Sequence, residues 1–468
     1  MFVTSKQRRS WPSVLAFAVV VVTAASASAD LEPSRFSAAG YFRVMTRPDL
    51  QGGDSQLGFW NLYGRLLNER PYALLDLRLN VIPQRQSSTE VWTRVHARIE
   101  GGSVGNMDSG GGNLQNFRLS QLYAEAGNIL LSDVTWRVGS LQTFFGDLGL
   151  YDFRPAELFF DTVGLSARYQ KGPVDLIVGA GDAGYFIRGS QYSTILTAGA
   201  TVRITAGPHL QLGAGAQGYL EPESEGNRFA PYDTPEVDYE NFIRGEVAQR
   251  FLEENPGMGA FFPDPVATSS DSFKLVGYLG FGGLGPLKWS ALHANLLRRH
   301  PDNFVTETAM GESFDIYVKS LTDERYQINI GNEMLLTLVE DRLDAAWGVF
   351  YGRHWNRDNG IKPDDDDRTF YSTVLRLQFY LNRTFHVLTE SSVAHEESSN
   401  GNLYRNFVDS VFQSTAGIAD PRGLEFGDAN TRNTWQGKFG FVLNPLGYGI
   451  YTRPSLRILY GVQYSTQN

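Results

Sequence analysis

Two glycine-rich segments of the chain have a spacing that is used to bind dinucleotides. Gly213 to Gly218 and Gly280 to Gly285 both fit the pattern G-x-G-x-x-G. A dinucleotide loop must open a helix, because the helix N-terminus holds the pyrophosphate. The first segment continues an alternating strand pattern, and the second runs into Pro286 and a further strand. The sequence therefore predicts that neither segment binds a nucleotide.

Acidic side chains are the other groups whose spacing could do chemistry. Glu253-Glu254 and Glu396-Glu397 would suit a glycosidase only with the carboxylates about 5 to 9.5 Å apart across a cleft, and adjacent strand residues point to opposite faces. Asp364 to Asp367 could bind calcium, but such a run is more typical of a solvated loop. The seven histidines have no zinc spacing, and neither G-x-S-x-G nor H-E-x-x-H occurs. We expect no catalytic residue, no cofactor, no metal and no enzyme activity.

The composition is that of a large β protein. The chain has 468 residues, 13% aromatic residues, 49 glycines, no cysteine and a net charge of -10. Without cysteine a disulfide scaffold is excluded, and the acidic charge argues against nucleic acid as a partner. These values leave one large barrel or several smaller domains.

The first 29 residues differ in kind from the rest. Three basic residues precede an apolar stretch at 14–22, and Ala27-Ser28-Ala29 forms a small-residue cleavage site before Asp30. The apolar stretch is too short to span about 30 Å of hydrocarbon. We therefore expect residues 1–29 to be an export signal and residues 30–468 to form a single domain.

Alternation of side-chain character with a period of two recurs along the mature chain. In residues 91–100, apolar residues or Thr at odd positions alternate with polar residues or Trp, and residues 373–380 and 456–463 also alternate. Cationic side chains opposite an apolar row suit a barrel with a wet lumen, although a soluble sandwich has the same period. No run of 18 apolar residues follows residue 30, so a helical membrane protein is excluded.

Short and long connections alternate between the expected strands. Short turns such as Gly285-Pro286 and Asn382-Arg383 are separated by long polar loops such as residues 222–269 and 398–430. Short turns at one rim and long loops at the other are typical of outer-membrane barrels. We predict an all-β fold, a transmembrane antiparallel β-barrel of about 16 to 18 strands with short periplasmic turns and long extracellular loops.

Several short segments of the chain match one known family in the same order. They are Gly40-Tyr41-Phe42-Arg43, similar to a first-strand G-Y-A-R; Phe117-Arg118 followed at a fixed spacing by Gly139; Asp147 and Asp152-Phe153; Trp355-Asn356-Arg357-Asp358-Asn359-Gly360, similar to W-D-N-D-N-G; and Ile450-Tyr451-Thr452-Arg453-Pro454-Ser455-Leu456-Arg457, similar to I-W-S-R-P-A-I-R. In these segments the chain resembles maltoporin, the trimeric sugar-selective porin of the outer membrane. The resemblance implies that the third loop folds inward and narrows the pore.

The resemblance also implies which residues contact a solute. A lane of aromatic rings gives weak sliding contacts to the apolar face of a sugar, while charged groups exchange hydrogen bonds with its hydroxyls. The positions that match the aromatic lane are Tyr41, Tyr72 and Tyr451, and those that match the polar track are Arg43, Arg118 and Asp152.

The chain departs from the family at three places. Arg154 stands where maltoporins have the tyrosine that blocks the constriction, and Phe145 stands where they have a track arginine. Arg154 could bind a different sugar or favour an anionic one, because a guanidinium fork grips carboxylates. The sequence stops at Asn468, where maltoporins continue into an eighteenth strand, so we expect truncation or an altered closure with the last strand parallel to the first.

We therefore predict that the protein is a porin of the Gram-negative outer membrane. It would passively conduct sugars or similar polar solutes without a cofactor. Its expected partners are a sugar or other small polar solute, outer-membrane lipid, further copies in a homotrimer, and the barrel-assembly machinery during insertion. Two alternatives stay open. One is a general or anion-selective porin, and the other is a secreted or periplasmic all-β carbohydrate-binding protein or glycosidase.

Overall fold

The computed structural model describes fourteen stretches of the chain, and the statements below concern them. They are residues 35–43, 72–83, 90–102, 117–151, 153–184, 194–222, 224–225, 266–267, 270–298, 304–309, 312–317, 326–355, 368–398 and 431–467. The expected export signal at 1–29, the site residue Asp152 and the acidic run Asp364 to Asp367 lie outside them. Within these stretches, no helix has the length and apolar character needed to cross a membrane.

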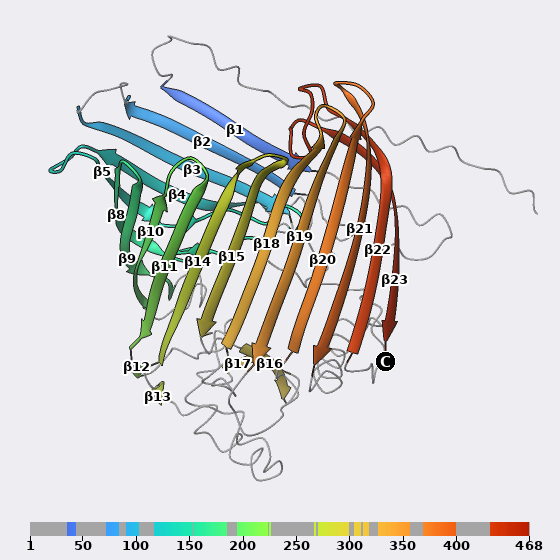
Figure 1. Cartoon of the computed structure of the whole chain (residues 1–468). Helices are drawn as coiled ribbons and strands as arrows, with labels where there is room; N and C mark the ends of the chain where they lie inside the picture. The colour runs from blue at the N-terminus through green and yellow to red at the C-terminus, as the bar shows by residue number, and fades with distance from the viewer. Residues whose placement is uncertain are drawn as a thin grey trace, which may run out of the picture.

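Seventeen strands form one antiparallel sheet (Figure 1). They are β1 (Phe36–Arg43), β2 (Tyr72–Ile82), β3 (Trp92–Gly102), β4 (Phe117–Gly127), β5 (Val134–Ser140), β8 (Val163–Lys171), β9 (Val174–Asp182), β10 (Leu196–Thr205), β11 (Leu210–Glu221), β14 (Ser270–Leu284), β15 (Leu287–Arg298), β18 (Tyr326–Val339), β19 (Leu343–Trp355), β20 (Arg368–Tyr380), β21 (Phe385–Ser398), β22 (Thr431–Leu443) and β23 (Leu456–Gln467). Each strand pairs with the next one of this series, which confirms the predicted all-β class and strand number.

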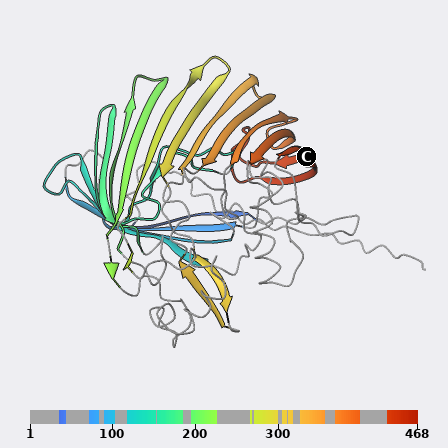
Figure 2. The same ribbon diagram turned by 90° about the horizontal axis from the view of Figure 1, so that it is seen from below.

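The sheet curves around a central space. Figure 2 shows it bending from β1, through the middle strands, to β23. Among the described residues, no pairing joins β1 to β23. The parallel pair of first and last strands that an odd strand number would give is therefore not among the described pairings.

The connections alternate in length as the sequence predicts. Short ones join β8 to β9 and β14 to β15 through residues 172–173 and 285–286, whereas residues 222–269 separate β11 from β14. The long stretch between β15 and β18 contains a hairpin of β16 (Phe304–Ala309) and β17 (Glu312–Tyr317). Because consecutive strands are antiparallel, the short connections all lie at one end of the sheet, which we call the short-turn rim.

The two faces of the sheet have opposite character. On β20, Leu375 and Phe379 are 43% and 39% exposed, whereas Arg376 and Gln378 on the other face are 5% and 0% exposed. A soluble β-sandwich buries its apolar row and exposes its polar row. Here the apolar row points outward and the polar row faces the central space.

The two G-x-G-x-x-G segments lie in this sheet. Gly213 to Gly218 falls within β11, and Gly280 to Gly285 ends β14 and enters the turn to β15. Neither opens a helix, so the prediction that they are strand sequence is confirmed.

Candidate functional site

The connection between β5 and β8, residues 141–162, lies against the inner face of the sheet. We call it the inner segment; it contains the short strands β6 (Thr143–Phe144) and β7 (Glu157–Leu158), which pair with each other. Leu148, Leu150 and Phe159 in it are at most 1% exposed. The predicted inward-folded third loop is confirmed by this arrangement.

The C-terminal part of the inner segment is fastened to the strands β11 and β15. The backbone N–H of Phe159 donates a hydrogen bond of 2.7 Å to Oε1 of Gln217, and Nδ2 of Asn295 donates one of 2.7 Å to the carbonyl of Pro155. A cluster of apolar side chains, including Val276 of β14, packs around these bonds. This part of the segment is therefore fixed by both polar and apolar contacts.

The tip of the inner segment lies on β18 to β20. Leu148, Leu150 and Tyr151 pack with Phe350 and Phe370 in one buried cluster. The backbone N–H of Leu150 also donates a hydrogen bond of 2.8 Å to the carboxylate of a buried glutamate on β18, Glu333. The segment thus follows the inner wall from β11 to β20 and leaves the inner face of β2 to β5 uncovered by these contacts.

Glycines on the inner face leave room for side chains of the inner segment, and we call these glycine positions seats. A Cβ atom at Gly213 would lie 2.5 Å from the ring of Phe145, and one at Gly331 would lie 2.3 Å from Leu148. Such distances are too short for real atoms, so only glycine lets the segment lie flush on the wall. Gly213, which belongs to one of the two segments that resemble a dinucleotide motif, therefore has a packing role.

The connection between β22 and β23, residues 444–455, also reaches the inner segment. Ile450 is buried in the same cluster as Leu148 and Leu150, and the hydroxyl of Tyr451 donates a hydrogen bond to Glu333. The ring centroid of Tyr451 lies 5.9 Å from that of Trp289. Burial, and next the Glu333 carboxylate, raise the pKa of the Tyr451 hydroxyl. Tyr451, a predicted lane residue, thus has its hydroxyl engaged within the protein.

Arg154 lies on the inner segment with 37% of its side chain exposed. Its guanidinium carbon is 4.5 Å from the ring centroid of Phe144, and its Nη1 is 4.0 Å from the carboxylate of Glu157. Phe145 is buried instead, with its ring stacked 5.7 Å from that of Tyr278. Of the two positions where a residue differs from the family's, Phe145 and Arg154, only Arg154 presents its side chain to solvent.

The remaining predicted residues gather near the opposite rim. Tyr41 pairs with Leu74 and Arg43 pairs with Tyr72, where β1 and β2 meet their long connection. Arg118 of β4 pairs with Glu100 of β3, near the long connection between these strands. The structure brings Tyr41, Arg43 and Tyr72 together, and places them at the other end of the sheet from Tyr451, which follows β22 at the short-turn rim.

An additional group of charged residues lies on the inner face of β2 to β5, and we call it the arginine wall. Its members are Arg78, Arg94, Arg98 and Arg137, with the carboxylates Asp76 and Glu125. Sequence reasoning noted the alternation on β3 but missed the group, because each arginine with an acidic partner is 12 to 31 residues from that partner in the chain.

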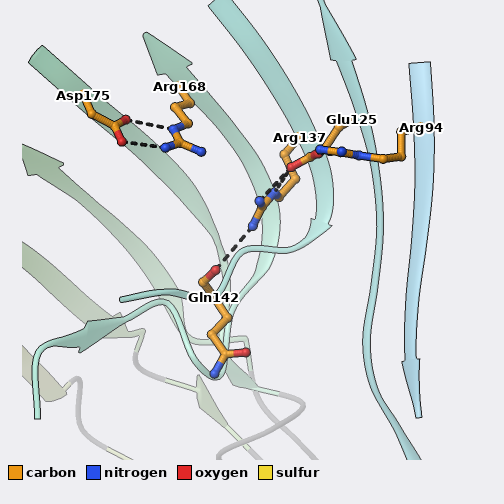
Figure 3. Close-up of polar contacts among 6 residues, drawn as sticks. All are labelled: Arg94, Glu125, Arg137, Gln142, Arg168 and Asp175. Atoms are coloured by element: carbon orange, nitrogen blue, oxygen red, sulfur yellow. Dashed lines mark hydrogen bonds and ion pairs between the residues drawn. The ribbon is translucent and has the colours of Figure 1, made fainter. Parts of the chain in front are cut away.

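The carboxylates of the arginine wall bridge neighbouring strands, and Figure 3 shows Glu125 between Arg94 and Arg137. Arg137 donates to Oε1 of Glu125 at 2.7 and 2.9 Å, and Arg94 donates to Oε2 of the same carboxylate at 3.2 Å through Nε. Arg98 donates to Asp76 at 2.8 and 3.1 Å. Two carboxylates thus hold three arginines extended along the wall.

Comparisons with known proteins find likeness only at the level of structure. No family model matches the chain, and no curated protein matches it. The chain is similar to OmpT, an outer membrane protein of Vibrio cholerae, at 9% identity over 70% of this chain and 80% of that chain, with a TM-score of 0.36. It is similar to OccAB2 of Acinetobacter baumannii at 9% identity over 85% and 87%, with a TM-score of 0.38. It is also similar to an anion-selective porin from Comamonas acidovorans at 10% identity over 70% and 79%, with a TM-score of 0.35. With TM-scores this low, none of these likenesses defines the function of the chain.

Proposed function

We propose that the chain is an outer-membrane porin through which small polar solutes pass passively. The observation that carries this proposal is the inverted wall, with aliphatic and aromatic side chains outward and charged or amide side chains inward. In water the outward row would be an exposed apolar surface of unusual size, whereas in lipid it is favourable. Neighbouring strands also satisfy each other's backbone groups, as a membrane requires. A secreted carbohydrate-binding protein or glycosidase would have the opposite pattern.

The location and assembly belong to the same proposal. Residues 1–29 direct export and are removed, and residues 30–468 form the porin domain in the outer membrane of a Gram-negative cell. The barrel-assembly machinery inserts this domain, and three copies form the mature porin. The maltoporin-like segments support these steps.

Sugars are the solute class that the maltoporin-like segments favour. Tyr41 lies on the same face as the inward Asp76, because it pairs with Leu74 two residues away. Arg154 over Phe144 adds an accessible pair of a guanidinium and an aromatic ring. Such pairs suit a sugar, whose ring has an apolar face and a rim of hydroxyls.

Liposome swelling tests the pore and the sugar preference together. Purified protein in liposomes should admit small sugars, and Arg154→Tyr should slow maltodextrin entry if this position controls sugar passage. Lys171→Tyr is the matched control, because Lys171 is the last residue of β8, next to the short turn, with 65% of its side chain exposed. Liposomes that admit no sugar would contradict the pore, and equal effects of both substitutions would contradict the role of Arg154.

A further inference from the structure

Two groups of three charged residues repeat one arrangement on the inner face. Arg94, Glu125 and Arg137 lie side by side on β3, β4 and β5, in direct cross-strand register. Arg376, Glu390 and Lys438 do the same on β20, β21 and β22. Each group places a carboxylate between two cations and has a net charge of about +1 at neutral pH.

The bonding within the second group resembles that within the first. Nε of Arg376 lies 2.6 Å from Oε2 of Glu390, and Nζ of Lys438 lies 3.6 Å from Oε1 of the same carboxylate. Except for Arg137 at the middle of β5, the members of both groups also lie in the half of their strands that is nearer the short-turn rim. Position and chemistry therefore do not separate the two groups.

Access to solvent separates them. The side chains of Arg94 and Arg137 are 33% and 23% exposed, whereas those of Arg376 and Lys438 are each 6% exposed. We call the first group the open triad and the second the buried triad. A solute in the central space can reach the guanidinium groups of the open triad only.

The surroundings of the open triad add positive charge and leave donors unused. Arg78, two strands from Glu125, is exposed on the same face, and Arg168 on β8 is 43% exposed beside Asp175. Arg94 and Arg168 bind their carboxylates through Nε and Nη2, and within the described residues no hydrogen bond uses their Nη1 groups. These N–H groups are free to donate hydrogen bonds to an incoming anion.

The position of Arg137 is fixed without being blocked. Its guanidinium carbon lies 4.2 Å from the ring centroid of Tyr123, and its Nη1 donates a 3.3 Å hydrogen bond to the carbonyl of Gln142. Tyr123 supports one face of the guanidinium, and Glu125 holds one edge. A cation held in this way does not need to be ordered when an anion arrives, which lowers the entropy cost of binding.

We propose that the open triad is a binding site for small organic carboxylates on the solute path, and that the buried triad only stabilises the wall. This proposal rests on the proposed porin function. A solute carboxylate accepts hydrogen bonds from the free guanidinium N–H groups, in the geometry that arginine offers to carboxylates. Glu125 competes for the same guanidinium groups, so each stay is brief, as conduction requires.

Planar-bilayer recording of the whole protein tests the proposal with a matched pair of triads. In a KCl gradient the wild type should select chloride over potassium, and gluconate should block the current more strongly than glucose, which lacks the carboxylate. Glu125→Gln should raise the chloride preference, and Arg94→Gln with Arg137→Gln should lower it by about threefold. Arg376→Gln with Lys438→Gln should leave it unchanged.

The outcomes separate the two proposals. If no channel forms, the porin function fails and the carboxylate site fails with it. If channels form but the wild type does not prefer chloride, or gluconate and glucose block equally, the carboxylate site alone is wrong. Equal shifts from the open and buried triads would also overturn it. The wild-type result decides even where a variant fails to fold.

Discussion

Single buried carboxylates hold the inner segment in place. Glu333 is 0% exposed and accepts hydrogen bonds from the backbone of Leu150 and the hydroxyl of Tyr451, so it joins the inner segment to the connection before β23. At the other end, Glu157 and Asp161 lie on the inner segment itself, with Lys274 nearby. Burial raises the pKa of both carboxyl groups above the ordinary range.

A raised pKa gives a pH dependence of definite sign. The folded state keeps the protons of Glu157 and Asp161 to a higher pH than the unfolded state, so their contribution to stability is complete below the unfolded pKa and is lost as pH rises through the folded pKa. The double variant Glu157→Gln, Asp161→Asn should therefore match the wild type in thermal stability at about pH 4 and exceed it at about pH 8.

The matched control for this prediction is Glu397→Gln on β21, whose side chain is exposed. It should follow the wild type at each pH. A double variant whose difference from the wild type does not change with pH would contradict the assignment of these two groups.

At the scale of elements, the inner segment and the wall fit because the wall lacks side chains where the segment lies. Gly213 and Gly331 make room for Phe145 and Leu148, respectively. The maltoporin resemblance predicts that this loop folds inward, but the seats could not be predicted, because each glycine is 68 or 183 residues from the side chain that it accommodates. Local periodicity carries no information about contacts between residues that are so far apart in the chain.

Filling one seat should displace the segment. Gly331→Val should push Leu148 away from β18 into the central space, lower the single-channel conductance and cost about 1 to 3 kcal/mol of stability through overpacking. Gly277→Val on β14 is the control, because a Cβ at Gly277 meets nothing within 4 Å. If both variants conduct as the wild type does, the inner segment does not set the pore size.

At the scale of the whole molecule, the fold follows from two simple patterns in the sequence. Alternation of period two predicts the strands, and it is confirmed in β3, β20 and β23. Alternation of short and long connections predicts that consecutive strands are antiparallel, which the pairing of the sheet confirms. The arginine wall escaped prediction because three strands, β3, β4 and β5, had to be placed side by side before Arg94 and Arg137 met Glu125. The resemblance suggests Tyr451 as a lane residue, but it does not predict that the hydroxyl of Tyr451 is hydrogen-bonded to Glu333.

From the inverted wall we infer that the molecule as a whole encloses a water-filled path across a membrane. The most direct measurement is the current through a planar lipid bilayer after addition of the purified, detergent-solubilised protein. The current should rise in uniform steps, one for each inserted unit. Protein that inserts and keeps its folded mobility on gels, yet leaves the bilayer non-conducting, would contradict the account.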